Sequence, residues 1–155
     1  MSEAVSESPV ATPKGIRGWL ILPAFGTCIS PLVLIASLVA TMPNYDRVWN
    51  LRGRLPTGLM AFISVEFIGN LAFIVGWIAA VVLLVTKSRG FPRLYVGLML
   101  GMLAFLVADL LISSVAFNIS PNPSDVTSIV RTAFVSAIWC PYMLSSKRVQ
   151  NTFVS

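Results

Sequence analysis

The sequence predicts an all-α, polytopic membrane protein folded as a bundle of four transmembrane helices. Composition is the first reason, because 56% of the 155 residues are hydrophobic and only 11% are charged, whereas soluble chains carry about a quarter charged residues. Patterning is the second, since four apolar stretches are each long enough to cross a hydrocarbon core of roughly 30 Å as a helix. The chain also contains no histidine, which excludes Ser-His and Cys-His catalysis and histidine metal sites.

The apolar stretches define the domain organisation. Four spans are expected, over about residues 19–42, 57–86, 94–117 and 126–144. Together they make residues 16–146 the transmembrane domain. Residues 1–15 are rich in Ser, Glu and Pro without periodicity, so we expect a disordered cytoplasmic tail. Residues 147–155 form a short basic juxtamembrane tail.

Breakers and polar residues shape the spans and their connections. Pro31 should kink the first helix by freeing a backbone carbonyl one turn earlier. The polar connection 43–56 can follow the membrane surface, and Ser124 or Asp125 can cap the fourth helix.

Orientation follows from the positions of Lys and Arg. Most lie before the first span, between the second and third, and after the fourth, so the positive-inside rule predicts that both termini are cytoplasmic. The basic first loop, with Arg47, Arg52 and Arg54, runs against this assignment. The residues expected to anchor the protein at the inner interface are Trp19, Tyr95, Tyr142, Lys147 and Arg148.

Three ionisable residues, Glu66, Asp109 and Arg131, lie inside apolar stretches. An unpaired charge at the bilayer centre costs about 2.5–3.5 kcal/mol on the insertion scale, so we expect these residues to be paired or hydrated. Helix rise puts all three in the outer half of the membrane, at the level of Pro31. Polar residues four positions away share their helix faces. The predicted intramembrane cluster is Glu66, Asn70, Asp109, Ser113 and Arg131.

A bidentate pair between Arg131 and one carboxylate is the expected core of this cluster, because a guanidinium group offers a planar fork to two oxygens. The second carboxylate is then left over, either protonated or holding a cation or the amine of a ligand. Two interpretations remain open. The cluster either fixes helix register and packing, or forms a site for a solute.

Small residues predict close helix contacts. Gly97 and Gly101 form a GxxxG pair, and Ala72, Gly76 and Ala80 form a ridge on the second span. Such residues serve contacts within one bundle or a homodimer. Cys28 and Cys140 lie in apolar stretches and are expected to be free, so neither a disulfide nor a metal site is predicted.

The carboxy-terminal segment IWCPYMLSSKRVQNTFV, residues 138–154, resembles a family signature. With GWLILPAFG near the start, Ser30-Pro31, Phe91-Pro92 and Arg131, it is similar to the YdgK-like bacterial inner-membrane proteins, the family called domain of unknown function 2569. Cys140 and Gln150 depart slightly from that pattern. The resemblance implies a four-helix protein of the bacterial inner membrane and supplies no mechanism.

The expected function is therefore non-enzymatic. We expect a small inner-membrane protein that acts by interaction or assembly, with the lipid bilayer and a second membrane protein or another copy as partners. No nucleic acid, cofactor or metal ion is expected. The alternative is a small transporter or binding protein that uses the surplus intramembrane carboxylate for a cation, a proton or an amine-bearing solute.

Overall fold

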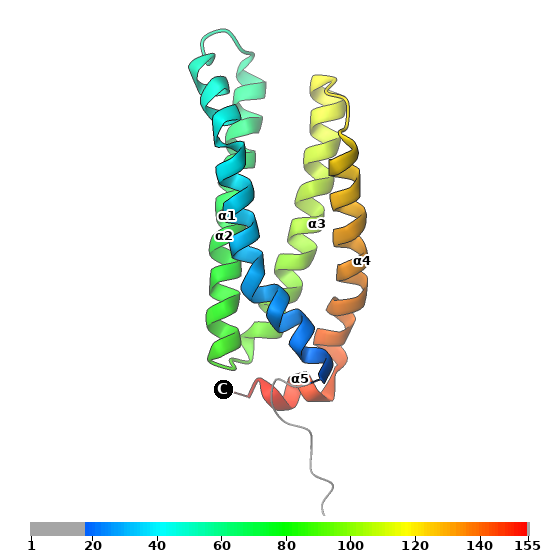
Figure 1. Ribbon diagram of the computed structural model, residues 1–155. Helices are drawn as coiled ribbons and strands as arrows, with labels where there is room; N and C mark the ends of the chain where they lie inside the picture. The colour runs from blue at the N-terminus through cyan, green and yellow to red at the C-terminus, as the bar shows by residue number, and fades with distance from the viewer. Residues whose placement is uncertain (1–17, 155) are drawn as a thin grey trace, which may run out of the picture.

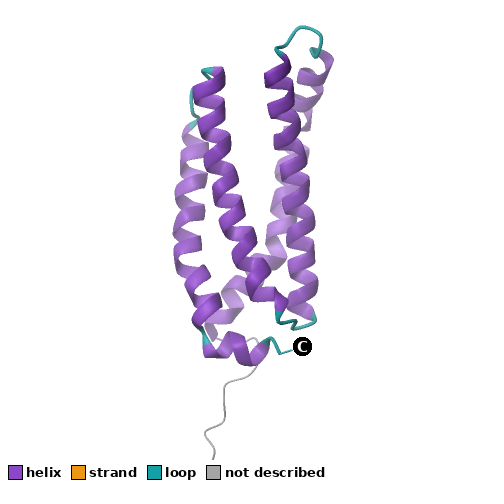
Figure 2. Ribbon diagram, turned by 180° about the vertical axis from the view of Figure 1, so that it is seen from behind, coloured by secondary structure: helices purple, strands orange, loops and turns teal. Residues whose placement is uncertain are grey.

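The computed structural model describes residues 18–154, which are helical apart from short connections (Figures 1 and 2). The elements are the 3-10 turn η1 Gly18–Leu20, α1 Ile21–Asn50, α2 Thr57–Val85, α3 Gly90–Phe117, α4 Pro123–Ser145 and α5 Lys147–Thr152. The described residues include no strand, so the all-α prediction is confirmed for this part of the chain. The predicted tail, residues 1–15, lies outside the described residues.

Three helices are long and apolar enough to cross a membrane, namely Gly18–Asn50, α2 and α3. This is a helical membrane protein. The fourth long helix, α4, has 23 residues and is shorter than the other three. It lies beside α3 and runs in the opposite direction (Figure 1).

The first helix is longer than the sequence predicted. The span was expected to end near residue 42, but α1 continues through Pro43 to Asn50, and only residues 51–56 connect it to α2. Proline removes one helical hydrogen bond, yet tertiary contacts hold the helix beyond it, because Tyr45 is buried and packs edge-on against Phe67 of α2 with ring centroids 5.2 Å apart. The polar segment before residue 51 is therefore helical and does not form a surface loop.

The first helix also changes direction along its length. Figure 1 shows its amino-terminal half crossing obliquely towards α4 and α5, and its other half running alongside α2. Pro31 lies inside this helix and is buried, which fits the kink expected there.

The start of α4 is set by a capping box. The Asn122 side chain accepts a hydrogen bond from the Ser124 backbone N–H at 3.2 Å, and the Asp125 carboxylate accepts one from the Asn122 N–H at 3.3 Å. The helix cap is thus Asn122, while Asp125 completes the reciprocal pair from the first turn. Before this cap, the connection after α3 runs back along α3, so α4 begins deeper in the molecule than α3 ends (Figure 1).

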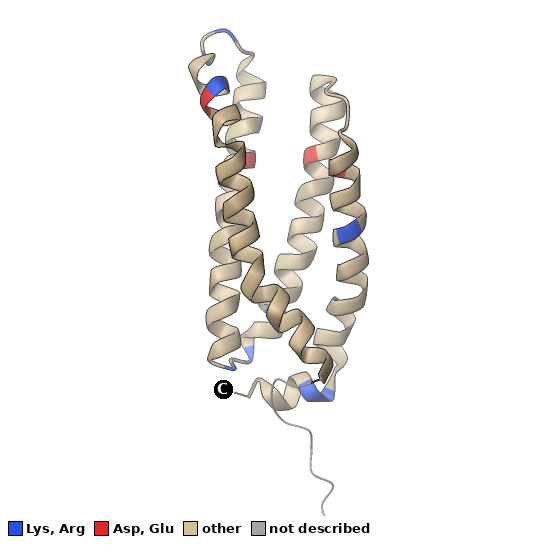
Figure 3. Ribbon diagram, in the orientation of Figure 1, with Lys and Arg blue, Asp and Glu red and all other residues tan. Residues whose placement is uncertain are grey.

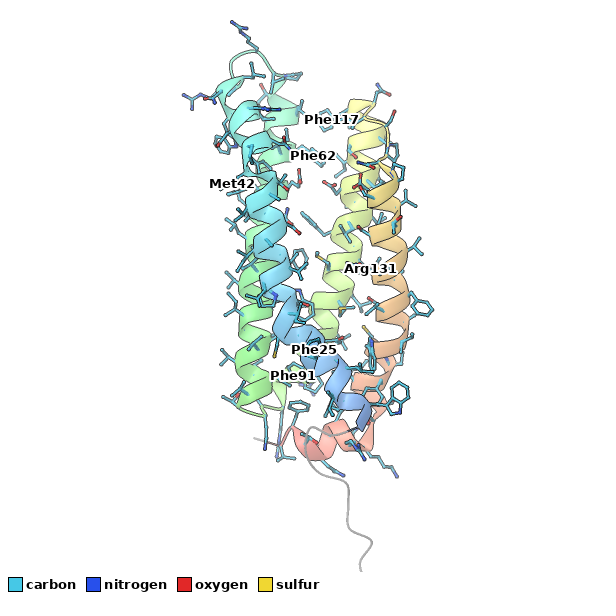
Figure 4. The ribbon with its side chains drawn as sticks, in the orientation of Figure 1. Phe25, Met42, Phe62, Phe91, Phe117 and Arg131 are labelled. Carbon is cyan, nitrogen blue, oxygen red and sulfur yellow. The ribbon has the colours of Figure 1, made fainter. Side chains whose placement is uncertain are left out.

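The best-packed core lies at the α5 end. Its fully or nearly fully buried side chains include Leu20, Trp77, Ala80, Phe91, Tyr95, Met143, Val149 and Phe153. At the other end the α1–α2 pair and the α3–α4 pair lie apart (Figures 1 and 2). Phe62 of α2 and Phe117 of α3 meet there, with ring centroids 5.4 Å apart (Figure 4).

The predicted small-residue contacts are only partly present. A Cβ added to Gly76 would lie 2.6 Å from the Leu98 side chain, so α2 and α3 approach closely there. Ala80 is fully buried, and a Cβ on Gly101 would touch Phe73 at 3.6 Å.

Two members of the predicted ridges lie elsewhere. A Cβ on Gly97 would meet no atom within 4 Å, and Ala72 is exposed. Their helix faces point away from the neighbouring helices of the chain. A close contact not predicted from the spacing occurs at Gly69, whose added Cβ would lie 2.6 Å from the Phe105 ring.

The residues predicted as interface anchors differ in their exposure. Trp19 is 71% exposed at the α5 end, and Lys147 is also exposed. Tyr95 is instead buried, with its ring edge-on against Trp77 at 5.7 Å. Tyr142 is half-buried, with its ring edge-on to Trp139 at 5.7 Å. Arg148 lies against Gly18, where an added Cβ would come within 2.6 Å of its guanidinium group.

Candidate functional site

The polar residues of the transmembrane helices gather in the half of the molecule far from α5. Figure 3 shows acidic positions on all four long helices in that half, while the basic positions lie at the two ends of the molecule apart from one on α4. That one is Arg131, the only Lys or Arg between Pro123 and Ser145.

Glu66 is held by a tyrosine from the neighbouring helix. The Tyr45 hydroxyl donates a hydrogen bond to Glu66 Oε1 at 3.0 Å. Tyr45 is 6% exposed, whereas Glu66 is half-buried. A hydrogen bond to a charged acceptor is stronger than one between neutral groups. The α1 extension beyond Pro43 therefore supplies the donor that positions the carboxylate.

Asn70 lies beside this pair, as expected, but it bonds to the backbone. Its side-chain amide donates to the Glu66 carbonyl oxygen at 3.1 Å and also interacts with the Tyr45 hydroxyl. Ser113 does not join the cluster, because its hydroxyl donates to the Leu110 carbonyl of its own helix at 3.0 Å. Serine and threonine hydroxyls inside helices commonly donate to a backbone carbonyl of the preceding turn.

Asp109 lies within electrostatic range of two other acids. It is half-buried on α3, and it acts electrostatically on Glu66 and is itself acted on by Asp125. Asp125 also acts on Glu66. We call Glu66, Asp109 and Asp125 the acidic layer. Among residues 18–154, no hydrogen-bond donor or cation is bonded to Asp109.

The predicted pair between Arg131 and a carboxylate is absent from the described part of the chain, in which no ion pair joins Arg131 to Glu66 or Asp109. The prediction assumed that α3 ends and α4 begins at one level. Because the connection between them runs back along α3, Asp125 reaches the level of Asp109 and Arg131 lies about 9 Å deeper, six residues further along α4. An arginine left without an anion in the hydrocarbon core costs about 2.5–3.5 kcal/mol on the insertion scale.

Arg131 instead lines a cavity of about 330 Å³ between the helices. All four long helices contribute to it. Its lining residues are Gly26, Ile29, Ser30, Val33, Leu34, Trp77, Met99, Met102, Arg131, Thr132 and Val135. The lining is predominantly apolar, and Arg131 is its only charged member. The cavity therefore offers a single cationic group in an apolar surround.

Sequence reasoning named five of the polar residues discussed above and missed two, Tyr45 and Asp125. Tyr45 was assigned to a loop because Pro43 and the polar residues that follow it suggested a break. Asp125 was treated only as a helix cap. For Asp125 a sequence signal was present, because Asn122 and Asp125 have the spacing of a capping box at the start of a helix. The depth at which that helix begins came only from the structure.

Comparison with known proteins gives a family. The family model described as "Protein of unknown function (DUF2569)" matches residues 13–154. The chain belongs to this family. The match includes every described helix and confirms the resemblance seen in the sequence. No curated protein and no solved structure matches the chain.

Proposed function

We propose that this DUF2569 protein is a non-enzymatic component of the bacterial inner membrane that acts by interaction or assembly. In this proposal α4 is the fourth crossing, since it runs beside α3. Both termini are cytoplasmic, because the α5 end carries a cluster of basic side chains. These residues include Lys87, Arg89, Arg93, Lys147 and Arg148.

One observation carries the proposal, namely that the acidic layer lacks a cation among the described residues. Carboxylates in an apolar region are costly unless they are paired, hydrated or protonated. The Glu66 carboxylate accepts a hydrogen bond from the Tyr45 hydroxyl. The Asp109 carboxylate accepts none from the described residues. A second membrane protein, or another copy, that brings Lys, Arg or a polar helix face to this layer would satisfy it.

The test compares stability with assembly. Glu66→Gln and Asp109→Asn remove the charges and keep the shapes, and Asp46→Asn is the matched control because Asp46 is exposed on α1. We expect Asp109→Asn to melt at or above the wild-type temperature in mild detergent, and Glu66→Gln to melt only slightly below it, because its amide oxygen still accepts a hydrogen bond from Tyr45. We also expect both variants to lose the higher-mass species that the wild type forms when extracted with its surrounding lipid, whereas Asp46→Asn keeps it.

The opposite pattern would identify a structural role. If both layer variants are destabilised by about 3–5 kcal/mol, as when a buried pair is broken, and the mass distribution is unchanged, the acidic layer holds the bundle together and the assembly proposal fails. A wild type that is monomeric in lipid also contradicts the proposal.

A second candidate is a small transporter or binding protein. It is favoured by three carboxylates within electrostatic range of one another and by the tyrosine hydroxyl bonded to one of them. Such a group can exchange a proton or hold a cation or a solute amine. Purified protein in liposomes should then carry protons or monovalent cations across the bilayer, and Asp109→Asn should abolish the flux. Flux in the wild type no greater than in empty liposomes would exclude this candidate for those ions.

A further inference from the structure

The cavity beside Arg131 has a buried floor and an exposed rim. Trp77 and Met99 form the floor and are 4% and 8% exposed. Ile29 and Val33 of α1 stand at the rim and are 37% and 50% exposed. In a bilayer, the exposed apolar face of a transmembrane helix contacts lipid chains. The mouth of this cavity therefore opens sideways, towards lipid, between α1 and α4.

The charged group of the cavity has no anionic partner within residues 18–154. Arg131 is exposed, and among the described residues it forms no ion pair or hydrogen bond. Figure 4 marks it partway along α4, well inside the ends of the helices. A guanidinium group carries five N–H donors in a planar fork that matches carboxylate and phosphate oxygens. The cavity thus presents unused donors for an oxyanion next to an apolar hollow.

The order of the lining residues gives the cavity a direction. Helices α1 and α4 run in opposite directions (Figure 1). On α4, Val135 lies one turn nearer the α5 end than Arg131, and on α1, Gly26 lies about two turns nearer that end than Val33. The cation is therefore at the end of the cavity farther from α5, and the apolar part continues from it towards the α5 end.

We infer that this cavity binds one anionic phospholipid from the leaflet at the α3–α4 turn. Its phosphate binds the Arg131 guanidinium group, and one acyl chain lies in the apolar part, from Val33 and Val135 towards Gly26. A lipid in that leaflet has its headgroup outward and its chain directed to the midplane, which matches the direction of the cavity. A long arginine side chain also extends towards the headgroup region, and the bilayer can thin locally to meet it.

The size and lining favour a lipid over a soluble anion. A volume of about 330 Å³ is at the lower end of the range of roughly 300–1,000 Å³ for ligand pockets, so it accommodates part of a lipid. A free phosphate ion would gain nothing from the apolar walls and would have to leave water. This inference does not depend on the proposed role of the acidic layer, which lies about 9 Å away along α4.

The experiment measures bound lipid on the purified protein by native mass spectrometry. The protein in mild detergent is titrated with phosphatidylglycerol, with phosphatidylcholine, and with phosphatidylglycerol in the presence of inorganic phosphate. We expect one phosphatidylglycerol to bind in preference to phosphatidylcholine. Because a hydrogen bond to a charged group is lost, Arg131→Gln should weaken phosphatidylglycerol binding about ten- to hundredfold and remove the preference. Arg131→Lys should keep part of the preference for phosphatidylglycerol.

Two glycine variants test the cavity itself. Gly26→Leu fills the hollow, because a Cβ at Gly26 meets no atom within 4 Å, and it should abolish the bound lipid. Gly97→Leu is the matched control, since a Cβ at Gly97 also meets no atom within 4 Å and Gly97 does not line the cavity. Gly97→Leu should bind phosphatidylglycerol as the wild type does. Circular-dichroism melts of each variant verify that it is folded.

Any of four results would overturn the inference. The first is wild-type preference for phosphatidylglycerol in Arg131→Gln. The second is unchanged lipid binding in a folded Gly26→Leu. The third is displacement of phosphatidylglycerol by inorganic phosphate at equal concentration, which would make Arg131 an anion site without a chain pocket. If instead the wild type holds no lipid and Arg131→Gln disrupts the higher-mass species, the anion belongs to a partner helix, and the lipid assignment is wrong.

Discussion

Replacing Phe153 with alanine should release the carboxy-terminal helix from the bundle. Phe153 is 3% exposed, and its ring lies 4.7 Å from the ring of the fully buried Phe91 at the start of α3. Val149, on the same short helix, is also fully buried. A hydrogen bond from Arg89 Nε to the Val154 carbonyl oxygen, at 2.9 Å, also attaches this segment to the start of α3. The aromatic contact is the largest apolar part of this attachment.

The magnitude follows from the buried area. An aromatic side chain buries roughly 150–250 Å², which at about 25 cal/mol per Å² is worth about 4–6 kcal/mol as an upper estimate. Phenylalanine-to-alanine changes in cores cost about 3–5 kcal/mol. Helix α5 has six residues, too few to be stable alone. The loss should therefore appear as local undocking of α5, with little change in the melting of α1–α4.

Hydrogen exchange of the α5 amides measures this directly. A loss of about 3 kcal/mol corresponds to exchange roughly a hundredfold faster or more. The matched control is Val154→Ala, because Val154 is 55% exposed and makes its hydrogen bond through the backbone. Equal exchange in Phe153→Ala and the wild type would refute the assignment of Phe153 as the anchor. So would an equally large effect of Val154→Ala.

Other substitutions give outcomes of known sign. Tyr45→Phe removes the donor to the Glu66 carboxylate and should lower stability by about 1.5–3 kcal/mol. A double-mutant cycle with Glu66→Gln should reveal coupling, and additive effects would argue against the bond. Gly69→Ala forces a shift of the Phe105 ring at a tight contact and should destabilise by about 1–3 kcal/mol. Gly97→Ala, in open space, should be neutral or stabilise by up to about 1 kcal/mol, and thermal melts that reverse this order would contradict the helix contacts described above. Ser136 Oγ is buried with no hydrogen-bond partner among the described residues, so Ser136→Ala should leave the melting temperature unchanged or raise it. A clear drop would mean that the hydroxyl binds something in the membrane.

Periodicity and composition predicted much of the local structure. The helical class, the approximate extent of α2 and the proline inside α1 all follow from apolar length and residue type. Helix ends were less predictable at prolines. Pro43 was expected to end a span, whereas it lies within α1. Pro92 was expected to precede the third span, but it lies in the first turn of α3, where a missing N–H costs little.

The sequence alone determined which residues are exceptional in this protein. Glu66, Asp109 and Arg131 are unusual wherever the helices are placed, because a charge in an apolar span always has a cost. Only the tertiary structure decided which of them are neighbours. The depth of a residue, when it is calculated from helix rise, depends on where its helix begins. Because the connection after α3 runs back along α3, α4 begins deeper than expected. Asp125, and not Arg131, therefore lies at the level of Asp109. As a result, Asp125 lies within electrostatic range of Asp109, and Arg131 lines a predominantly apolar cavity.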